Sequence, residues 1–159
     1  MYYRKHSGEP FGGQINRRAL RSLVDAGTIP GLLAYADGIP IGWISLGPRQ
    51  QYPRLNGSPV MRPVDDRPVW SIVCFFVDPD HRGTGVTRSL LKAAIDFSRS
   101  RGAQMLEAYP VDAAEPTYPD WFGGKAIFDR EGFTEVARRR SNRPVVRRRL
   151  RPRRRRSPS

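Results

Sequence analysis

Apolar residues follow two different spacings along the chain, and the change from one to the other marks a strand followed by a helix. The stretch Val69–Val77 is rich in β-branched and aromatic residues, which is typical of a buried strand. After a short polar turn, the apolar residues return at helical spacing: Val86, Leu90, Leu91, Ala94 and Phe97. This spacing predicts an amphipathic helix that ends at Gly102.

Shorter elements precede this unit and are separated by turn residues. A helix is expected from Asn16 to Ala26, because its apolar residues share one face and Gly27 follows it. The dipeptide Asp37-Gly38 is a strong hairpin signal, and it stands between the apolar runs 32–36 and 39–46. The first part of the chain therefore predicts a helix and two antiparallel strands.

Three further strands, one short helix and two irregular segments complete the expected arrangement. The strands are expected at 104–109, 133–136 and 144–146, the helix within 121–130, and the proline-containing irregular segments at 47–68 and 111–120. A single mixed, mostly antiparallel sheet flanked by helices is the economical way to bury these apolar faces. The sequence thus predicts an α/β (α+β) fold.

The chain has the length of one domain, and its charge is unevenly distributed. The net charge is +13, but twelve arginines and no acidic residue lie between Arg138 and the C-terminus, so the rest is balanced to +1. We therefore expect a loosely ordered segment over 1–15, a folded domain over 16–150 and a basic disordered tail over 151–159. Such a tail can bind nucleic acid non-specifically through salt-dependent contacts.

Cysteine and histidine are scarce, which restricts redox and metal chemistry. Cys74 is the only cysteine and lies within an apolar strand, so a small core residue is the favoured interpretation over a nucleophile. A chain without a disulfide framework fits a reducing compartment, and we expect a cytoplasmic protein. With two histidines, no metal cluster is expected. No stretch approaches the roughly 20 apolar residues of a membrane span, so no membrane partner is expected.

Two glycines stand where the central strand gives way to the helix. The turn reads Arg82-Gly83-Thr84-Gly85, and glycine lets the backbone reverse sharply and approach a ligand closely. The first N–H groups of the following helix have no partner within the helix, and the helix dipole favours negative charge at the same place. The turn therefore predicts a phosphate-like anion site, with a plain tight turn as the alternative.

The run from Val77 to Thr87, VDPDHRGTGVT, carries a family resemblance together with Gly132-Phe133 near the end of the domain. It is similar to the pyrophosphate loop of the GCN5-related N-acetyltransferase (GNAT) superfamily. That loop has Arg or Gln, two residues, Gly, one residue, then Gly or Ala; Arg82, Gly85 and Thr87 fill these three places. Finer features over 16–150 resemble an actinobacterial subgroup.

The resemblance implies a GNAT-like acyl-CoA transferase fold and acetyl-CoA as co-substrate, without a metal. Pyrophosphate would lie on the backbone amides of the loop, and pantetheine would run beside the preceding strand. The implied cofactor-binding residues are Phe76, Val77, Arg82, Gly83, Thr84, Gly85, Val86 and Thr87. The family's usual first strand and helix are expected to be absent, and Met1 is expected to be an internal or mis-assigned start. If the chain does begin at Met1, one edge of the sheet is expected to be exposed, which favours a homodimer.

The implied activity is transfer of an acetyl group to a primary amine of a small molecule or a protein. The tyrosine that many members use as general acid is Phe128 here, so other groups must be considered. Glu107 is the candidate base, and Tyr109 and Tyr118 are candidate phenols. Each candidate also has a purely structural interpretation. Glu107 would be an exposed carboxylate or one paired to an arginine, and the two tyrosines would be packing aromatics.

Two other functions stay open from the sequence. One is a catalytically weak or inactive acyl-CoA-binding or regulatory domain, which the absence of the usual tyrosine suggests. The other is polyanion binding through the arginine-rich tail, with the domain as a scaffold.

Overall fold

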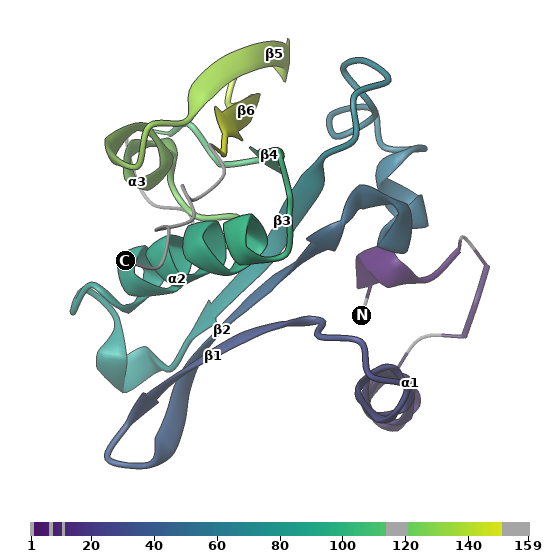
Figure 1. Cartoon of the computed structure of the whole chain (residues 1–159), viewed down its shortest axis with the longest axis vertical. Helices are drawn as coiled ribbons and strands as arrows, with labels where there is room; N and C mark the ends of the chain where they lie inside the picture. The colour runs from purple at the N-terminus through teal and green to yellow at the C-terminus, as the bar shows by residue number, and fades with distance from the viewer. Residues whose placement is uncertain (1, 7, 11, 114–120, 151–159) are drawn as a thin grey trace, which may run out of the picture.

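The computed structural model describes residues 2–6, 8–10, 12–113 and 121–150. Six strands form one sheet in the order β1-β2-β3-β4-β6-β5, in which only β3 and β4 run parallel (Figure 1). The strands are β1 Gly31–Ala36, β2 Ile39–Pro48, β3 Trp70–Val77, β4 Met105–Ala108, β5 Thr134–Arg140 and β6 Arg143–Arg149. The predicted mixed, mostly antiparallel sheet is therefore confirmed.

The β1–β2 hairpin forms where its turn residues require it. Asp37 and Gly38 have φ angles of 49° and 77°, so both lie in the left-handed region that two-residue hairpin turns of type I′ need. Asparagine, aspartate and glycine tolerate this region best, which is why Asp-Gly gives a strong signal. The predicted hairpin is confirmed, and β1 forms one edge of the sheet.

The central strand leads into the main helix as predicted. Strand β3 is followed by a 3₁₀ turn, η4 Pro79–His81, and by α2 Val86–Ser100. The helix buries its apolar stripe against the sheet, and its first turn packs closely on Gly42 of β2. A Cβ atom added at Gly42 would lie 2.9 Å from Val86 and 3.1 Å from Leu90, so glycine allows this contact.

A β-bulge in β3 changes which side chains face α2. Ser45 of β2 pairs with Cys74, but the next residue, Leu46, pairs with Ile72, so Val73 is the extra residue. Ile72 and Phe75 pack into the core under α2, whereas Val73 and Cys74 face the opposite side. The bulge therefore places two consecutive side chains on the same face of the sheet.

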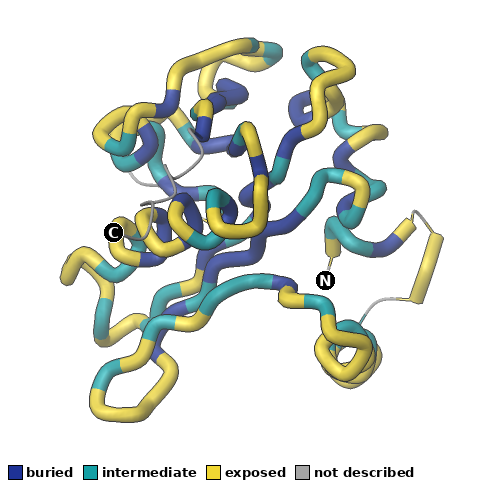
Figure 2. Tube along the Cα trace, viewed as in Figure 1, coloured by how far each residue is buried: buried dark blue, intermediate teal, exposed yellow. Residues whose placement is uncertain are grey.

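The two faces of the sheet are covered differently. Helix α2 lies on one face, and the N-terminal helix α1 Gly13–Asp25 lies on the other side of β1–β3 (Figure 1). None of the residues of α1 is buried, whereas most residues in the middle of β2 and β3 are buried (Figure 2). A second core of Tyr52, Leu55 and neighbouring apolar residues lies on the face opposite α2.

Several predicted boundaries were wrong by a few residues. Helix α1 starts at Gly13 rather than Asn16, and α3 covers only Lys125–Arg130. The helix cannot extend back to Trp121, because Gly123 has a φ of 75° and its carbonyl accepts a hydrogen bond from Val111 instead. Strands β5 and β6 are longer than predicted, and Arg138, Arg139 and Arg147 within them bond to other parts of the fold.

The segment 47–68 is compact rather than fully irregular. It contains two 3₁₀ turns, η2 Arg49–Gln51 and η3 Pro53–Leu55, and it buries Tyr52 and Leu55 completely. A further 3₁₀ turn, η1 Tyr2–Arg4, lies near η3 in the fold. Within the described residues, no helix is both long and apolar enough to cross a membrane.

Candidate functional site

The glycine turn at the start of α2 is open and pre-formed. Gly83 and Gly85 have φ angles of 74° and 89°, and an added Cβ at either would meet nothing within 4 Å. The turn is braced from inside, because the Thr84 hydroxyl donates to the carbonyl of His81 at 2.6 Å. Residues 82–85 are exposed, so their backbone faces solvent beside the positive end of the helix dipole. The turn thus has the shape and polarity of an anion cradle.

The strand that leads to this turn has one edge without a strand partner. Strand β4 pairs with β3 only from Trp70 to Ile72, and beyond that point no strand of the described part continues on this side. Two backbone groups on this edge bond to residues outside the sheet instead. The N–H of Phe75 donates to the carbonyl of Trp121 at 2.7 Å, and the carbonyl of Val77 accepts from Arg82 Nε at 3.3 Å. This edge is the feature that can accept an extended ligand.

A pocket of about 440 Å³ lies on the face of the sheet opposite α2. The bulged residues Val73 and Cys74 contribute to it, together with residues of β2, α1, η1 and the segment after residue 120. Its lining residues are Tyr2, Tyr3, Arg4, Leu20, Trp43, Ser45, Tyr52, Val73, Cys74, Trp121 and Phe122. We call it the aromatic pocket. Trp121 links the two features, because its carbonyl holds the N–H of Phe75 while the residue lines the pocket.

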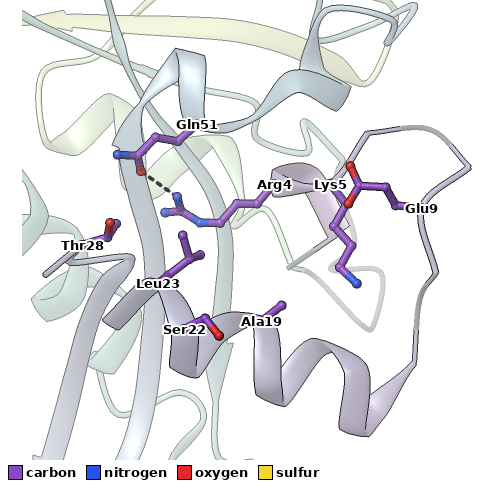
Figure 3. A pocket seen from close by; sticks show the side chains of 8 residues that line it. All are labelled: Arg4, Lys5, Glu9, Ala19, Ser22, Leu23, Thr28 and Gln51. Carbon is purple, nitrogen blue, oxygen red and sulfur yellow. Dashed lines mark hydrogen bonds between the residues drawn. The ribbon is translucent and has the colours of Figure 1, made fainter. Parts of the chain in front are cut away.

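Arg4 fixes the N-terminal wall of the aromatic pocket. Its guanidinium donates to Gln51 Oε1 and to the Tyr52 hydroxyl, both at 2.6 Å, and to two backbone carbonyls, and it stacks on the Tyr52 ring. Figure 3 shows this side chain reaching from η1 to Gln51. It also borders a second pocket of about 470 Å³ between η1 and α1. The residues of η1 are therefore tied to β2 and η2.

A cluster of charged side chains is buried on the same face, between β4, β6 and the segment 47–68. Glu107 is fully buried, and its two oxygens accept from Arg49 Nη1 and from Arg147 Nε, each at 2.7 Å. Tyr109 donates to the same carboxylate at 2.6 Å. Arg147 also pairs with Asp65 at 2.7 Å. Two guanidiniums and two carboxylates thus balance one another, and they fasten the segment 47–68 to the sheet.

Burial on this face keeps its phenols and its thiol protonated. Burial raises the pKa of Tyr52 to about 12, and burial together with the Glu107 charge raises the pKa of Tyr109 well above its usual value. Burial also raises the pKa of the Cys74 thiol, which lowers its reactivity as a nucleophile. These groups are proton donors or spectators near neutral pH rather than bases.

The structure brings together some of the residues that the sequence singled out and separates others. The loop from Arg82 to Thr87 lies beside the end of β3, because Arg82 donates to the carbonyl of Val77. The cofactor-binding role of this loop and of Phe76 and Val77 stays a prediction. Glu107 and Tyr109 lie in the buried cluster, with Glu107 paired to arginines, and their catalytic roles stay predictions. Tyr118 lies outside the described residues.

Phe128, which replaces the family's usual tyrosine, is fully buried against Phe75 and Phe133, with ring centroids 6.1 and 5.2 Å away. The sequence reasoning missed Arg4 and Arg49, whose long-range partners leave no local pattern.

The comparison with protein families decides the classification. The family model "Acetyltransferase (GNAT) family" matches residues 4–123, which is most of the chain and includes the glycine turn. The chain belongs to the GNAT family. A search of curated proteins finds no match. The actinobacterial subgroup therefore stays a prediction.

Solved structures of GNAT proteins share the fold. A ribosomal-protein-alanine N-acetyltransferase from Brucella melitensis is 22% identical with a TM-score of 0.59, over 89% of this chain and 81% of that one. An N-acetyltransferase from Staphylococcus aureus Mu50 is 14% identical with a TM-score of 0.60, over 88% and 79%. The yncA protein from Salmonella typhimurium, solved with its cofactor acetyl-CoA, is 20% identical with a TM-score of 0.58, over 89% and 76%. At these identities the likeness establishes the fold.

The residues of the turn fit a pyrophosphate group. The space beside Gly83 and Gly85 is free, both glycines have left-handed φ angles, and α2 begins directly after Gly85 with its unpaired first N–H groups. The family and its fold thus support an acyl-CoA-dependent acetyltransferase. No group of three or more potential metal ligands occurs among the described residues.

Proposed function

We propose that this GNAT protein transfers an acetyl group from acetyl-CoA to a primary amine of a small molecule or a protein. One observation carries the proposal: the open glycine turn between β3 and α2 adjoins an unpaired edge of β3. On that edge, no strand of the described residues pairs with β3 beyond Ile72. Acetyl-CoA supplies an acetyl group activated as a thioester. The amine nitrogen forms a bond to the carbonyl carbon of that group, the C–S bond breaks, and a proton from the amine is transferred to the sulfur. Nitrogen must attack as the neutral amine.

In this proposal the backbone holds most of the cofactor. The amides of Arg82–Thr87 bind the pyrophosphate, and the edge at Phe76 and Val77 binds the pantetheine. The N–H of Phe75 is the donor on this edge that can stabilise negative charge on a carbonyl oxygen, once the Trp121 carbonyl releases it. The contact between Phe75 and Trp121 therefore has to exchange when the edge is occupied.

Burial argues against acid or base roles for two of the three candidates. Glu107 and Tyr109 act as positioning residues, because their polar atoms already bond to Arg49, Arg147 and Ser71. The Tyr118 phenol is the candidate that gives a proton to the departing sulfur. The cytoplasmic location, the homodimer and the nucleic-acid contact of the tail stay predictions from the sequence.

A matched pair of glycine variants tests the cofactor site. Gly85 and Gly102 stand at the two ends of α2, both have positive φ angles, 89° and 80°, and neither has an atom within 4 Å of an added Cβ. Valine at either position brings similar backbone strain, about 1–2 kcal/mol or somewhat more. Only Gly85→Val places a side chain in the cradle.

Calorimetry with acetyl-CoA and thiol release with a panel of amines give the readout. We expect Gly85→Val to weaken acetyl-CoA binding at least 100-fold and Gly102→Val to leave the affinity unchanged, with circular dichroism confirming that both fold. Equal affinity of the two variants would place the cofactor elsewhere. If the protein binds acetyl-CoA but releases no thiol with any amine, it is an acyl-CoA-binding domain and not an enzyme.

A further inference from the structure

The aromatic pocket has a lining that selects among amines. Its walls combine rings from parts of the chain that are far apart in sequence. Tyr2 and Tyr3 meet edge to face with centroids 5.0 Å apart, and Tyr3 and Phe122 lie 6.2 Å apart. Trp43, Tyr52 and Trp121 add further aromatic surface. Aromatic walls of this kind favour flat apolar groups, which they bury and contact edge to face or by offset stacking.

The charge around the aromatic pocket is positive. Three arginines stack on three of its rings, at distances of 4.1 to 4.3 Å between guanidinium carbon and ring centroid: Arg4 on Tyr52, Arg54 on Tyr2 and Arg143 on Phe122. Neither aspartate nor glutamate occurs among the described residues that line it. A ligand with several ammonium groups would therefore meet repulsion without a compensating carboxylate.

The same surroundings would favour the reactive form of a bound amine. Apolar walls disfavour the charged ammonium, and nearby cations disfavour it further, so both effects lower the pKa of an amine in this pocket. The neutral amine is the form that attacks a thioester, and its proton can leave to solvent before binding. A pocket with these properties needs no carboxylate base at the nitrogen, which agrees with the paired state of Glu107.

The size of the aromatic pocket limits the ligand. About 440 Å³ suits a molecule with one or two rings, and residues Tyr2–Arg4 close one side of it. Arg4 holds that side in place through four hydrogen bonds to the rest of the fold. The floor at Val73 and Cys74 belongs to the strand whose edge serves the proposed cofactor site.

We propose that the acceptor is a small arylalkylamine whose ring lies in the aromatic pocket, and that polycationic amines are rejected. This inference rests on the proposed acetyl transfer and names its substrate class. The ring supplies the binding energy, and the amino group points along the floor toward the edge of β3.

The test compares amines that differ in one feature, with acetyl-CoA at saturation and thiol release as the readout. We expect kcat/KM for phenethylamine to exceed that for propylamine by on the order of 30-fold, because burial of a phenyl ring removes a large apolar area from water. Spermidine, kanamycin and a peptide with N-terminal alanine should react more slowly than phenethylamine. A preference for any of these three overturns the inference while acetyl transfer stands.

Two pocket variants and one surface variant connect the preference to the aromatic pocket. Phe122→Ala removes one aromatic side chain from the lining. Leu20→Trp fills the pocket from helix α1, which has no buried residue, so we expect this variant to fold. Each should lower kcat/KM for phenethylamine about tenfold or more and leave calorimetric acetyl-CoA binding unchanged. Tyr35→Ala, at a tyrosine that is 60% exposed outside the pocket, should change neither.

The outcomes separate the two proposals. If both pocket variants keep the wild-type preference, the ring binds elsewhere and the inference is wrong. If the wild-type protein neither binds acetyl-CoA nor releases thiol with any amine, the proposed function itself fails and the inference falls with it.

Discussion

Replacing Glu107 with glutamine should test the buried charge cluster most directly. The carboxylate is fully buried and lies between two guanidiniums at 2.7 Å, so Glu107→Gln leaves Arg49 and Arg147 with one fewer negative charge. The new amide group would also point donor hydrogens at existing donors. Removing one partner of a buried ion pair costs about 3–5 kcal/mol, which is a large share of the 5–15 kcal/mol typical of a domain.

Asp65→Asn is the matched control. Asp65 pairs with the same arginine at 2.7 Å, but its side chain is 37% exposed, so water can replace much of what is lost. We expect this variant to lose much less stability than Glu107→Gln, because an exposed ion pair contributes little. The two substitutions remove the same charge from the same cluster and differ mainly in burial.

Urea unfolding followed by tryptophan fluorescence measures both effects. With a slope of about 2 kcal/mol per molar urea, Glu107→Gln should lower the midpoint by about 2 M and Asp65→Asn by much less. Equal shifts would refute the reasoning from burial. A stable Glu107→Gln protein that loses turnover at saturating substrates would instead support a catalytic base, as the sequence first suggested.

Two further predictions concern buried tyrosines and a close backbone contact. Tyr52 and Tyr109 have raised pKa values in the folded state, and that of Tyr52 is about 12 against 10.0 in the unfolded chain. The free energy of unfolding should therefore be unaffected by these phenols below about pH 10 and fall as the pH rises toward 12, by about 3 kcal/mol for Tyr52. Tyrosinate absorbance should rise together with loss of circular dichroism, and ionisation of these two phenols before unfolding would contradict their burial. Gly31→Ala should destabilise the protein by about 2 kcal/mol or more, because the new Cβ would lie 2.1 Å from the carbonyl oxygen of Ile44. In thermal melts, Gly57→Ala, which meets no atom within 4 Å, should stay near the wild type, and an equal loss at both positions would be evidence against this contact.

Local patterns predicted the elements whose causes are local. Helix α2 was predicted because its apolar residues repeat at helical spacing. The first hairpin was predicted because Asp37 and Gly38 tolerate the left-handed φ angles that its two-residue turn requires. The glycine turn belongs to the same class, since its geometry follows from Gly83 and Gly85 themselves. These features needed no knowledge of distant partners.

The features that were missed depend on partners far along the chain. Arg147 is buried in β6 only because Asp65, 82 residues earlier, and Glu107 neutralise it, so a run of arginines could not be read as a strand core. Arg4 likewise finds Gln51 and Tyr52 only in the folded state. The aromatic pocket is assembled from separate segments, and no single stretch of sequence carries its pattern.

The bulge at Val73 has a consequence for how β3 tolerates change. Before it, Ser71 faces the charge cluster and Ile72 faces α2; after it, Phe75 takes the α2 side and Cys74 the other. The strand therefore contains two alternating patterns that are out of step by one residue. Deleting Val73 would bring the two patterns into step and leave the side chains on both sides of the bulge on their present faces. The deletion should therefore cost the protein mainly the contacts that Val73 makes in the second core and in the aromatic pocket, whereas deleting a residue of a regular strand turns one half of that strand inside out.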